Sequence, residues 1–159
     1  MRSLFILLSF VFLYSANAQT VNVIKFQQLE EYFNKKNDTL YVINFWATWC
    51  KPCVEELPFF EKINAEYKNQ KVKVILISMD FKSKVTERVI PFVKRNKIAS
   101  EVVLLDEPDY NAWIDKVSPN WSGAIPATIF VNASKGIRQF YEQSFDYAQL
   151  KETIDKNNQ

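Results

Sequence analysis

The sequence predicts an α/β domain built on a mixed sheet, and three observations carry this prediction. Residues 41–46 (YVINFW) and 71–80 (KVKVILISMD) are apolar runs rich in β-branched and aromatic residues, which is typical of strands buried on both faces. The segment between them has helical periodicity, so the two strands should be parallel. Residues 128–131 and 137–141 are apolar strands separated by the turn 132–136, which predicts an antiparallel hairpin.

Length and composition fit one domain. The chain has 159 residues, of which 48% are hydrophobic, and this suffices for a hydrophobic core that needs no disulfide or metal to stabilise it. Repeats, low-complexity tracts and Gly/Ser linkers are absent from the sequence. The formal net charge of +2 is spread without a basic block, which predicts no nucleic-acid partner.

The first 18 residues predict a secretory signal peptide. Arg2 supplies a positive charge, residues 4–14 form an apolar run, and Ala16-Asn17-Ala18 is a small-x-small cleavage signal. Eleven helical residues would span roughly 17 Å, too little for a hydrocarbon core of about 30 Å, so no stable membrane insertion is expected. We therefore expect cleavage after Ala18, a periplasmic or secreted protein, and a single mature domain over residues 19–159.

In chain order, residues 21–24 predict a short edge strand, and Phe26, Leu29 and Phe33 recur at helical spacing. Asn37-Asp38 is a turn signal before the strand at 39–47. The helix that follows should reach Tyr67, with a bend at Pro58.

The secondary structure of the segment after residue 80 is less clearly indicated by the sequence. Apolar positions at 85–93 indicate a helix in which Pro91 marks either a kink or a new start. Residues 102–105 predict a strand, and Asp109 is the expected N-cap of a short helix bearing Trp113, Ile114 and Val117. Asp146 and Gln149 predict a capping box for the last helix.

The two cysteines, Cys50 and Cys53, lie at the junction between the strand at 39–47 and the helix that follows it. Pro52 is suited to the first turn of this helix. The free N–H groups and the dipole at a helix start favour a thiolate at Cys50. A zinc site needs about four ligands, whereas this chain has two Cys and no His, so no metal is expected. A structural disulfide is the alternative, but so short a loop contributes little stability, and a redox-active pair is the better interpretation.

The segments FWATWCKPC and VEELP resemble the thioredoxin superfamily, and most closely its TlpA/ResA-like branch of exported proteins. The resemblance implies a thioredoxin-like fold: a central mixed β-sheet flanked by helices, with the strand and helix over 102–117 as the β/α insertion of that branch. It also implies that Ile125-Pro126 forms a cis-proline loop beside the redox pair, so that the Ile125 backbone can pair with an extended substrate segment.

The resemblance implies roles for individual residues. Cys50 would be the nucleophile, Cys53 the resolving thiol and Glu56 the proton acceptor and donor; a solvated helix face is the alternative for Glu56, and Glu55 should point away. Asn44 stands where thioredoxin has a buried aspartate, which favours Glu56 as its replacement. A catalytic role is further expected for the loop residue Pro126, and the expected substrate-binding residues are Trp49, Lys51, Pro52, Ile125 and Trp121. Core packing is the expectation for Trp46 and the alternative for Trp121.

The predicted function is therefore that of an exported protein disulfide reductase, acting as a monomer without a cofactor. The family resemblance implies protein disulfide substrates, apocytochromes in cytochrome c maturation among them, and a membrane thiol carrier as electron donor. Alternatives are a disulfide oxidase or isomerase, a thiol peroxidase, and a redox-inert binding module on the same scaffold.

Overall fold

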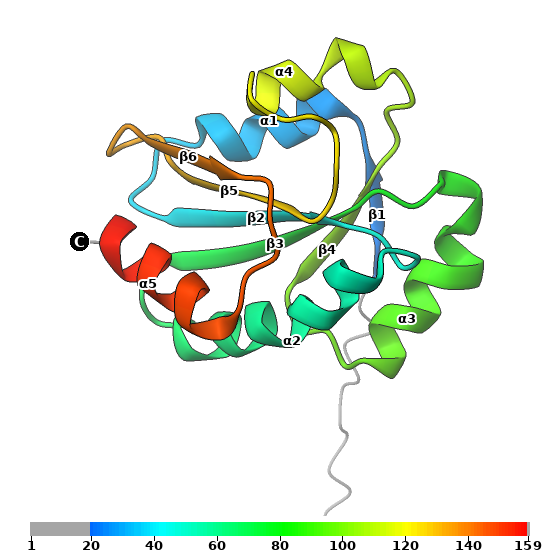
Figure 1. Cartoon of the computed structure of the whole chain (residues 1–159), viewed down its shortest axis with the longest axis horizontal. Helices are drawn as coiled ribbons and strands as arrows, with labels where there is room; N and C mark the ends of the chain where they lie inside the picture. The colour runs from blue at the N-terminus through cyan, green and yellow to red at the C-terminus, as the bar shows by residue number, and fades with distance from the viewer. Residues whose placement is uncertain (1–19, 159) are drawn as a thin grey trace, which may run out of the picture.

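The computed structural model of the protein describes residues 20–158, so the predicted signal peptide lies outside the described residues. Its elements follow the predicted order, with two strands joined by a helix before a C-terminal hairpin and helix (Figure 1). The strands are β1 (Asn22–Ile24), β2 (Leu40–Trp46), β3 (Val72–Ser78), β4 (Glu101–Leu105), β5 (Ala127–Asn132) and β6 (Ile137–Tyr141). The α-helices are α1 (Phe26–Asn34), α2 (Lys51–Glu66), α3 (Ile90–Arg95), α4 (Ile114–Val117) and α5 (Tyr147–Asn157).

The strands form one mixed sheet in the order β1-β4-β3-β2-β5-β6. Strands β1, β4, β3 and β2 are mutually parallel along this order, whereas β5 pairs antiparallel with β2 and β6 antiparallel with β5. The strand predicted at 102–105 lies between β1 and β3 rather than at an edge. The predicted mixed sheet and C-terminal hairpin are thus confirmed.

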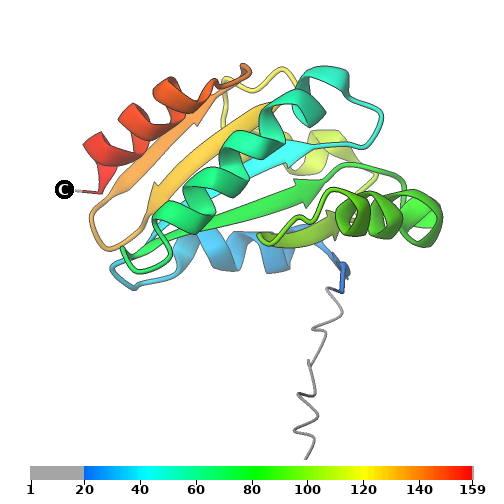
Figure 2. The same ribbon diagram turned by 90° about the horizontal axis from the view of Figure 1, so that it is seen from below.

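Helices cover both faces of the sheet, with α1 and α4 on one face and α2 and α5 on the other (Figures 1 and 2). Two apolar cores result, one on each face. All seven residues of β2 are buried between these layers, which explains its nearly continuous apolar sequence. The amide side chain of Asn44 is the polar exception in β2. Thr128 of β5 lies directly opposite Asn44 across the antiparallel ladder.

Helix α2 starts directly after Cys50, with Pro52 in its first turn as predicted. It runs without interruption through Pro58, whose ring is exposed. None of the helices formed by residues 20–158 is long and apolar enough to cross a bilayer.

The segment after β3 is one helical stretch that changes type just before Pro91. A 3₁₀ turn at Lys82–Lys84 leads into a π-helix at Val85–Val89, and α3 starts at Ile90 with Pro91 in its first turn. The π-helix runs directly into α3, because Val89 and Ile90 both keep helical backbone angles and the Ile90 N–H bonds to the Val85 carbonyl. Pro91 therefore lies in a continuous helical segment, where the wide turn of the π-helix gives way to an α-helix.

Asp109 occupies the N-cap position of a 3₁₀ turn at Tyr110–Ala112, and not that of the short helix α4 that bears Ile114 and Val117. Its side chain accepts no capping hydrogen bond. Trp113, with φ of −139°, interrupts the helix because its buried ring packs against Phe26 and Trp121. The capping box of α5 is confirmed, since Asp146 accepts from the Gln149 N–H at 2.8 Å and the Gln149 amide accepts from the Asp146 N–H.

Candidate functional site

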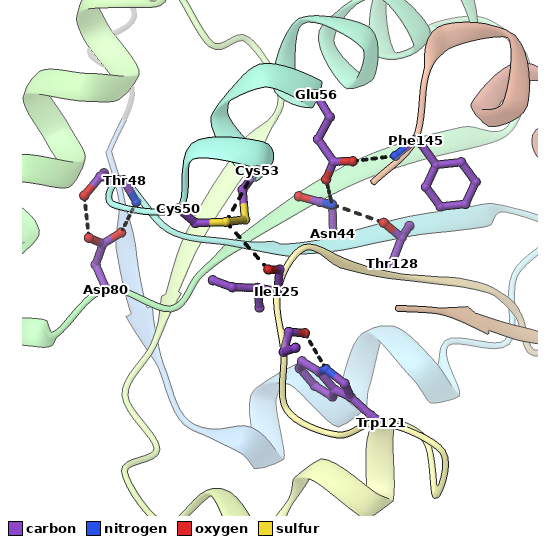
Figure 3. Close-up of a disulfide and its surroundings, with 11 residues drawn as sticks. Asn44, Thr48, Cys50, Cys53, Glu56, Asp80, Trp121, Ile125, Thr128 and Phe145 are labelled. Carbon is purple, nitrogen blue, oxygen red and sulfur yellow. Dashed lines mark hydrogen bonds between the residues drawn. A yellow bond between two sulfur atoms is a disulfide. The ribbon is translucent and has the colours of Figure 1, made fainter. Parts of the chain in front are cut away.

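Cys50 and Cys53 form a disulfide at the start of α2 (Figure 3). Cys50 is the N-cap residue, with extended backbone angles (φ −87°, ψ 102°), and its Sγ accepts a hydrogen bond from the Cys53 N–H at 3.3 Å. The cap that most helices build from an oxygen is here a sulfur. After reduction, the same N–H and the helix dipole would stabilise a Cys50 thiolate.

The two sulfurs differ in access. Cys50 retains 6% of its surface, whereas Cys53, in the first turn of α2, is fully buried. A substrate can therefore approach Cys50 and not Cys53, which is the asymmetry expected of an attacking thiol and a resolving thiol.

The loop before β5 lies against the disulfide. The Ile125-Pro126 peptide bond is cis, as the family resemblance implies, and Pro126 is buried. The carbonyl oxygen of Ile125 is 3.7 Å from Cys50 Sγ (Figure 3). When Cys50 is a thiol, its S–H can donate to this oxygen. The redox pair and the loop are thus brought together from positions 75 residues apart in the sequence.

Glu56 is buried one turn along α2 from Cys53, with 2% of its surface exposed, so the solvated-face alternative is wrong. Its carboxylate accepts hydrogen bonds from Asn44 Nδ2 at 2.8 Å and from the Phe145 N–H at 2.7 Å. Asn44 Nδ2 also donates to Thr128 Oγ1 at 3.1 Å (Figure 3). By contrast, the neighbouring Glu55 is exposed, as predicted.

The surroundings of Glu56 raise its pKa from 4.5 to about 7. Burial is the largest cause, because it disfavours the charged form; the hydrogen bonds from Phe145 and Asn44 act in the opposite direction. The described residues offer Glu56 no ion-pair partner. A buried carboxyl that titrates near neutral pH is suited to proton transfer.

This pKa makes the stability of the oxidised protein depend on pH. The folded protein holds the Glu56 proton up to about pH 7, whereas the unfolded chain releases it near 4.5. The stabilisation is therefore complete below about pH 4.5 and is lost as pH rises to about 7. Relative to Glu56→Gln, we expect the free energy of unfolding to fall by about 3 kcal/mol across this window, measured by urea denaturation.

Glu55→Gln is the matched control, because it makes the same substitution at an exposed adjacent position. Its stability profile should run parallel to that of the wild type between pH 4 and 8 to within about 0.5 kcal/mol. A Glu56→Gln profile parallel to both would show that Glu56 has an ordinary pKa.

Sequence reasoning missed a second buried carboxylate, Asp80, which anchors the loop before Cys50. Its Oδ2 accepts from the Thr48 N–H at 2.9 Å and its Oδ1 from Thr48 Oγ1 at 2.5 Å. Ser78 Oγ also donates to Asp80, at 2.9 Å. Asp80 follows β3, and Thr48 follows β2, so parallel strands bring both to one edge of the sheet. The position of Thr48 and Asp80 at the ends of two predicted parallel strands was the sequence signal that could have identified their contact.

The predicted substrate-binding residues around Cys50 are exposed. Trp49 shows 61% of its surface, and Lys51 and Pro52 are also open to solvent. Lys51 Nζ lies 3.7 Å from the exposed carboxylate of Glu55 on the next turn, a weak surface pair. Trp46 is fully buried and packs against Phe92, as expected of a core residue.

Trp121 lies in the core, as its packing alternative requires, and not on the surface of a groove. It retains 5% of its surface and packs against Phe45, at 4.6 Å between ring centroids, and Phe140. Its Nε1 donates to the Ala124 carbonyl at 2.8 Å, directly before Ile125 (Figure 3). Trp121 thus holds the proline loop in position from the core side, through its hydrogen bond to Ala124.

Within the part of the chain that the structure describes, no group of three or more His, Cys, Asp or Glu side chains is arranged to hold an ion.

The sequence is similar to a known protein family and to thioredoxin-like and thiol-disulfide oxidoreductase relatives. The sequence profile of the AhpC/TSA family matches residues 15–140. Over 49 residues, 31% of the chain and 26% of the relative, the sequence is 41% identical to the thiol-disulfide oxidoreductase ResA of Oceanobacillus iheyensis. It is 26% identical to the thioredoxin-like protein YneN of Bacillus subtilis over 72% of the chain and 62% of YneN. The chain thus spans about a quarter and about three fifths of these two relatives.

Solved structures share the fold. A thiol:disulfide interchange protein of the thioredoxin family from Chlorobium tepidum superposes with a TM-score of 0.64 at 20% identity, over 77% of this chain and 81% of that one. StoA from Bacillus subtilis gives a TM-score of 0.56 at 23% identity, over 74% and 84%. The sheet and its flanking helices therefore form a thioredoxin-like fold, and the chain belongs to the AhpC/TSA family.

Proposed function

We propose that the protein is a thiol-disulfide oxidoreductase that reduces disulfides of other proteins. The observation that carries the proposal is the Cys50–Cys53 disulfide at the start of α2, with the more accessible sulfur 3.7 Å from the Ile125 carbonyl of the proline loop. Two of the matched proteins have names of the same activity class, one as a thiol-disulfide oxidoreductase and one as a thiol:disulfide interchange protein, and these names support the proposal.

The reaction runs in two exchanges. The Cys50 thiolate attacks one sulfur of a substrate disulfide, forming a mixed disulfide and releasing the other substrate sulfur as a thiolate. Cys53, as a thiolate, then attacks Cys50 Sγ, which re-forms the Cys50–Cys53 disulfide and releases the second substrate thiolate. The substrate gains two electrons and the protein loses two, so a dithiol donor must reduce the protein again.

Glu56 is the proposed proton acceptor for Cys53. The Cys53 thiol is fully buried, which disfavours its thiolate, and a base is needed before it can attack. Glu56 lies one turn along the same helix and has a pKa of about 7, so at neutral pH it is ionised in about half of the molecules. The Asn44 amide and the Phe145 N–H hold the carboxylate in place.

The pH dependence of the second exchange tests this role. In a mixed disulfide between Cys50 and a small thiol, release by Cys53 should accelerate as pH rises through about 7, following ionisation of Glu56. In Glu56→Gln the increase of the release rate around pH 7 should disappear, and release at pH 7 should be roughly 10²-fold slower. If the inflection near pH 7 persists in Glu56→Gln, another group is the base; Glu55→Gln serves as the matched control.

Substrates would bind across the tip of the site. The exposed residues Trp49, Lys51 and Pro52 neighbour Cys50 in the sequence, and the Ile125 backbone, 3.7 Å from Cys50 Sγ, would pair with an extended substrate segment. Pro126 would hold the loop in the orientation that presents Ile125. Trp121 supports this loop from the core through Ala124.

The predicted signal peptide and the family resemblance support a proposal for the cellular setting. Cleavage after Ala18 would deliver residues 19–159 as a single monomeric domain to the periplasm or the exterior. There a membrane thiol carrier would be the electron donor, and apocytochromes awaiting haem are the substrates suggested by the family resemblance. Neither a cofactor nor nucleic acid has a part in this scheme.

Reduction of insulin disulfides tests the proposed function. The pre-reduced protein should release insulin thiols stoichiometrically, and catalytically when dithiothreitol is supplied, at a rate well above that of dithiothreitol alone. A protein that accelerates neither reaction would refute the proposal. Acceleration of peroxide consumption instead would favour the thiol peroxidase alternative.

A further inference from the structure

A groove of about 260 Å³ lies beside the active-site loop. One wall is formed by Thr48 and Trp49, directly before Cys50, and the other by residues 87–95 of the helical segment that follows β3. In Figure 3, Thr48 lies on the opposite side of Cys50 from Ile125. The groove therefore continues the substrate surface on the side of the disulfide that the proline loop does not cover.

The wall at 87–95 presents one face of a helix. Arg88, Phe92 and Arg95 follow each other at spacings of four and three, which places them in a row along that face, with Pro91 exposed beside them. Arg88 belongs to the π-helix at Val85–Val89. Such wide turns are rare and occur frequently at functional sites.

The groove is positively charged. Among the ion pairs of residues 20–158, none involves Arg88 or Arg95. The single acid of the groove, Glu87, is paired with Lys84 Nζ at 2.7 Å. The Arg95 guanidinium lies 5.8 Å from the centroid of the Phe92 ring. Arg88 also stabilises the charged form of Glu87, although the two form no ion pair. With two guanidinium groups and one acid already paired with Lys84, the groove keeps a net positive charge next to an exposed indole and can bind carboxylates.

We propose that this groove binds an acidic segment of the protein substrate that flanks the cysteine attacked by Cys50. Carboxylates of the segment would pair with Arg88 and Arg95, and an apolar side chain between them would lie against Trp49 and Pro91. The proposal rests on the proposed disulfide exchange and adds to it a class of substrate. The charge of the groove selects the occupant, since a basic segment would be repelled.

Two peptide disulfides test the groove. Each is a homodimer of one short peptide, and the two differ only in the residues flanking the cysteine, which are Glu in one and Gln in the other. The pre-reduced wild-type protein at low salt should reduce the Glu peptide about tenfold faster, measured as the second-order rate of thiol release. This advantage should decline as salt rises to about 0.5 M. In Arg88→Gln/Arg95→Gln it should fall to about twofold or less.

The matched control is Lys68→Gln/Lys94→Gln. It removes the same net charge from exposed positions that do not line the groove, and Lys94 lies in the same helix as Arg95. This variant should retain the tenfold advantage. A wild type without preference, an arginine variant that keeps it, or a lysine variant that loses it equally would each overturn the proposal. Reduction of neutral 2-hydroxyethyl disulfide by the wild type separates this failure from failure of the proposed function, in which no disulfide is reduced.

Discussion

Replacing Cys50 by serine is expected to lower the rate of insulin reduction by at least about a thousandfold, to the rate of the reductant alone. The serine hydroxyl keeps the N-cap position and can still accept the Cys53 N–H, so the helix should remain intact. It cannot serve as the attacking thiolate, and Cys53, which is fully buried, cannot replace it.

Far-ultraviolet circular dichroism and the thermal midpoint separate this loss from unfolding. The appropriate reference is the reduced wild type, because the variant also lacks the disulfide. Turnover retained in a folded Cys50→Ser protein would contradict the assigned nucleophile.

Replacing Cys53 by serine is expected to stop turnover after the first exchange. Cys50 would still attack, because its sulfur is the more accessible one, and the mixed disulfide would persist without the thiol that resolves it. The reduced variant should therefore accumulate one covalently bound substrate chain per protein, visible by mass spectrometry and released by dithiothreitol. Wild type treated alike should accumulate none.

The double variant Cys50→Ser/Cys53→Ser is the control for adventitious disulfides, and it should trap nothing since the sequence has two cysteines in all. A Cys53→Ser protein that turns over at the wild-type rate would contradict the two-cysteine mechanism.

Local chemistry predicted the position of the redox pair, whereas the proline loop beside it was expected only from the family resemblance. An apolar run that ends before Cys50-Lys51-Pro52-Cys53 indicates where a helix must start, and resemblance to a known family placed Ile125-Pro126 beside it. The burial of Glu56 could be anticipated from its helical spacing to Cys53. The redox pair and Glu56 belong to one helix and its N-cap, so their relative positions needed no knowledge of how distant segments pack, and the family resemblance supplied that knowledge for the proline loop.

The remaining features depend on such packing. Phe145, whose N–H binds Glu56, lies 89 residues further along the chain, and a backbone donor leaves no trace in the sequence. Asp109 has the residue type of an N-cap, but the buried ring of Trp113 determines the path of the chain there. The sequence left open whether Trp121 lines the substrate surface or packs in the core, and contacts with Phe45 and Phe140 bury it. Local propensity gives way to tertiary contacts at each of these positions.

The reduction potential of the Cys50/Cys53 couple tests the central claim most directly. The protein would be equilibrated in graded mixtures of reduced and oxidised dithiothreitol and of glutathione, and its free thiols trapped by alkylation and counted by mass spectrometry. We expect a single two-electron transition at about −270 mV or below, the range of reductases. A potential near −120 mV would make the protein an oxidant, and a pair that never exchanges would contradict a redox function altogether.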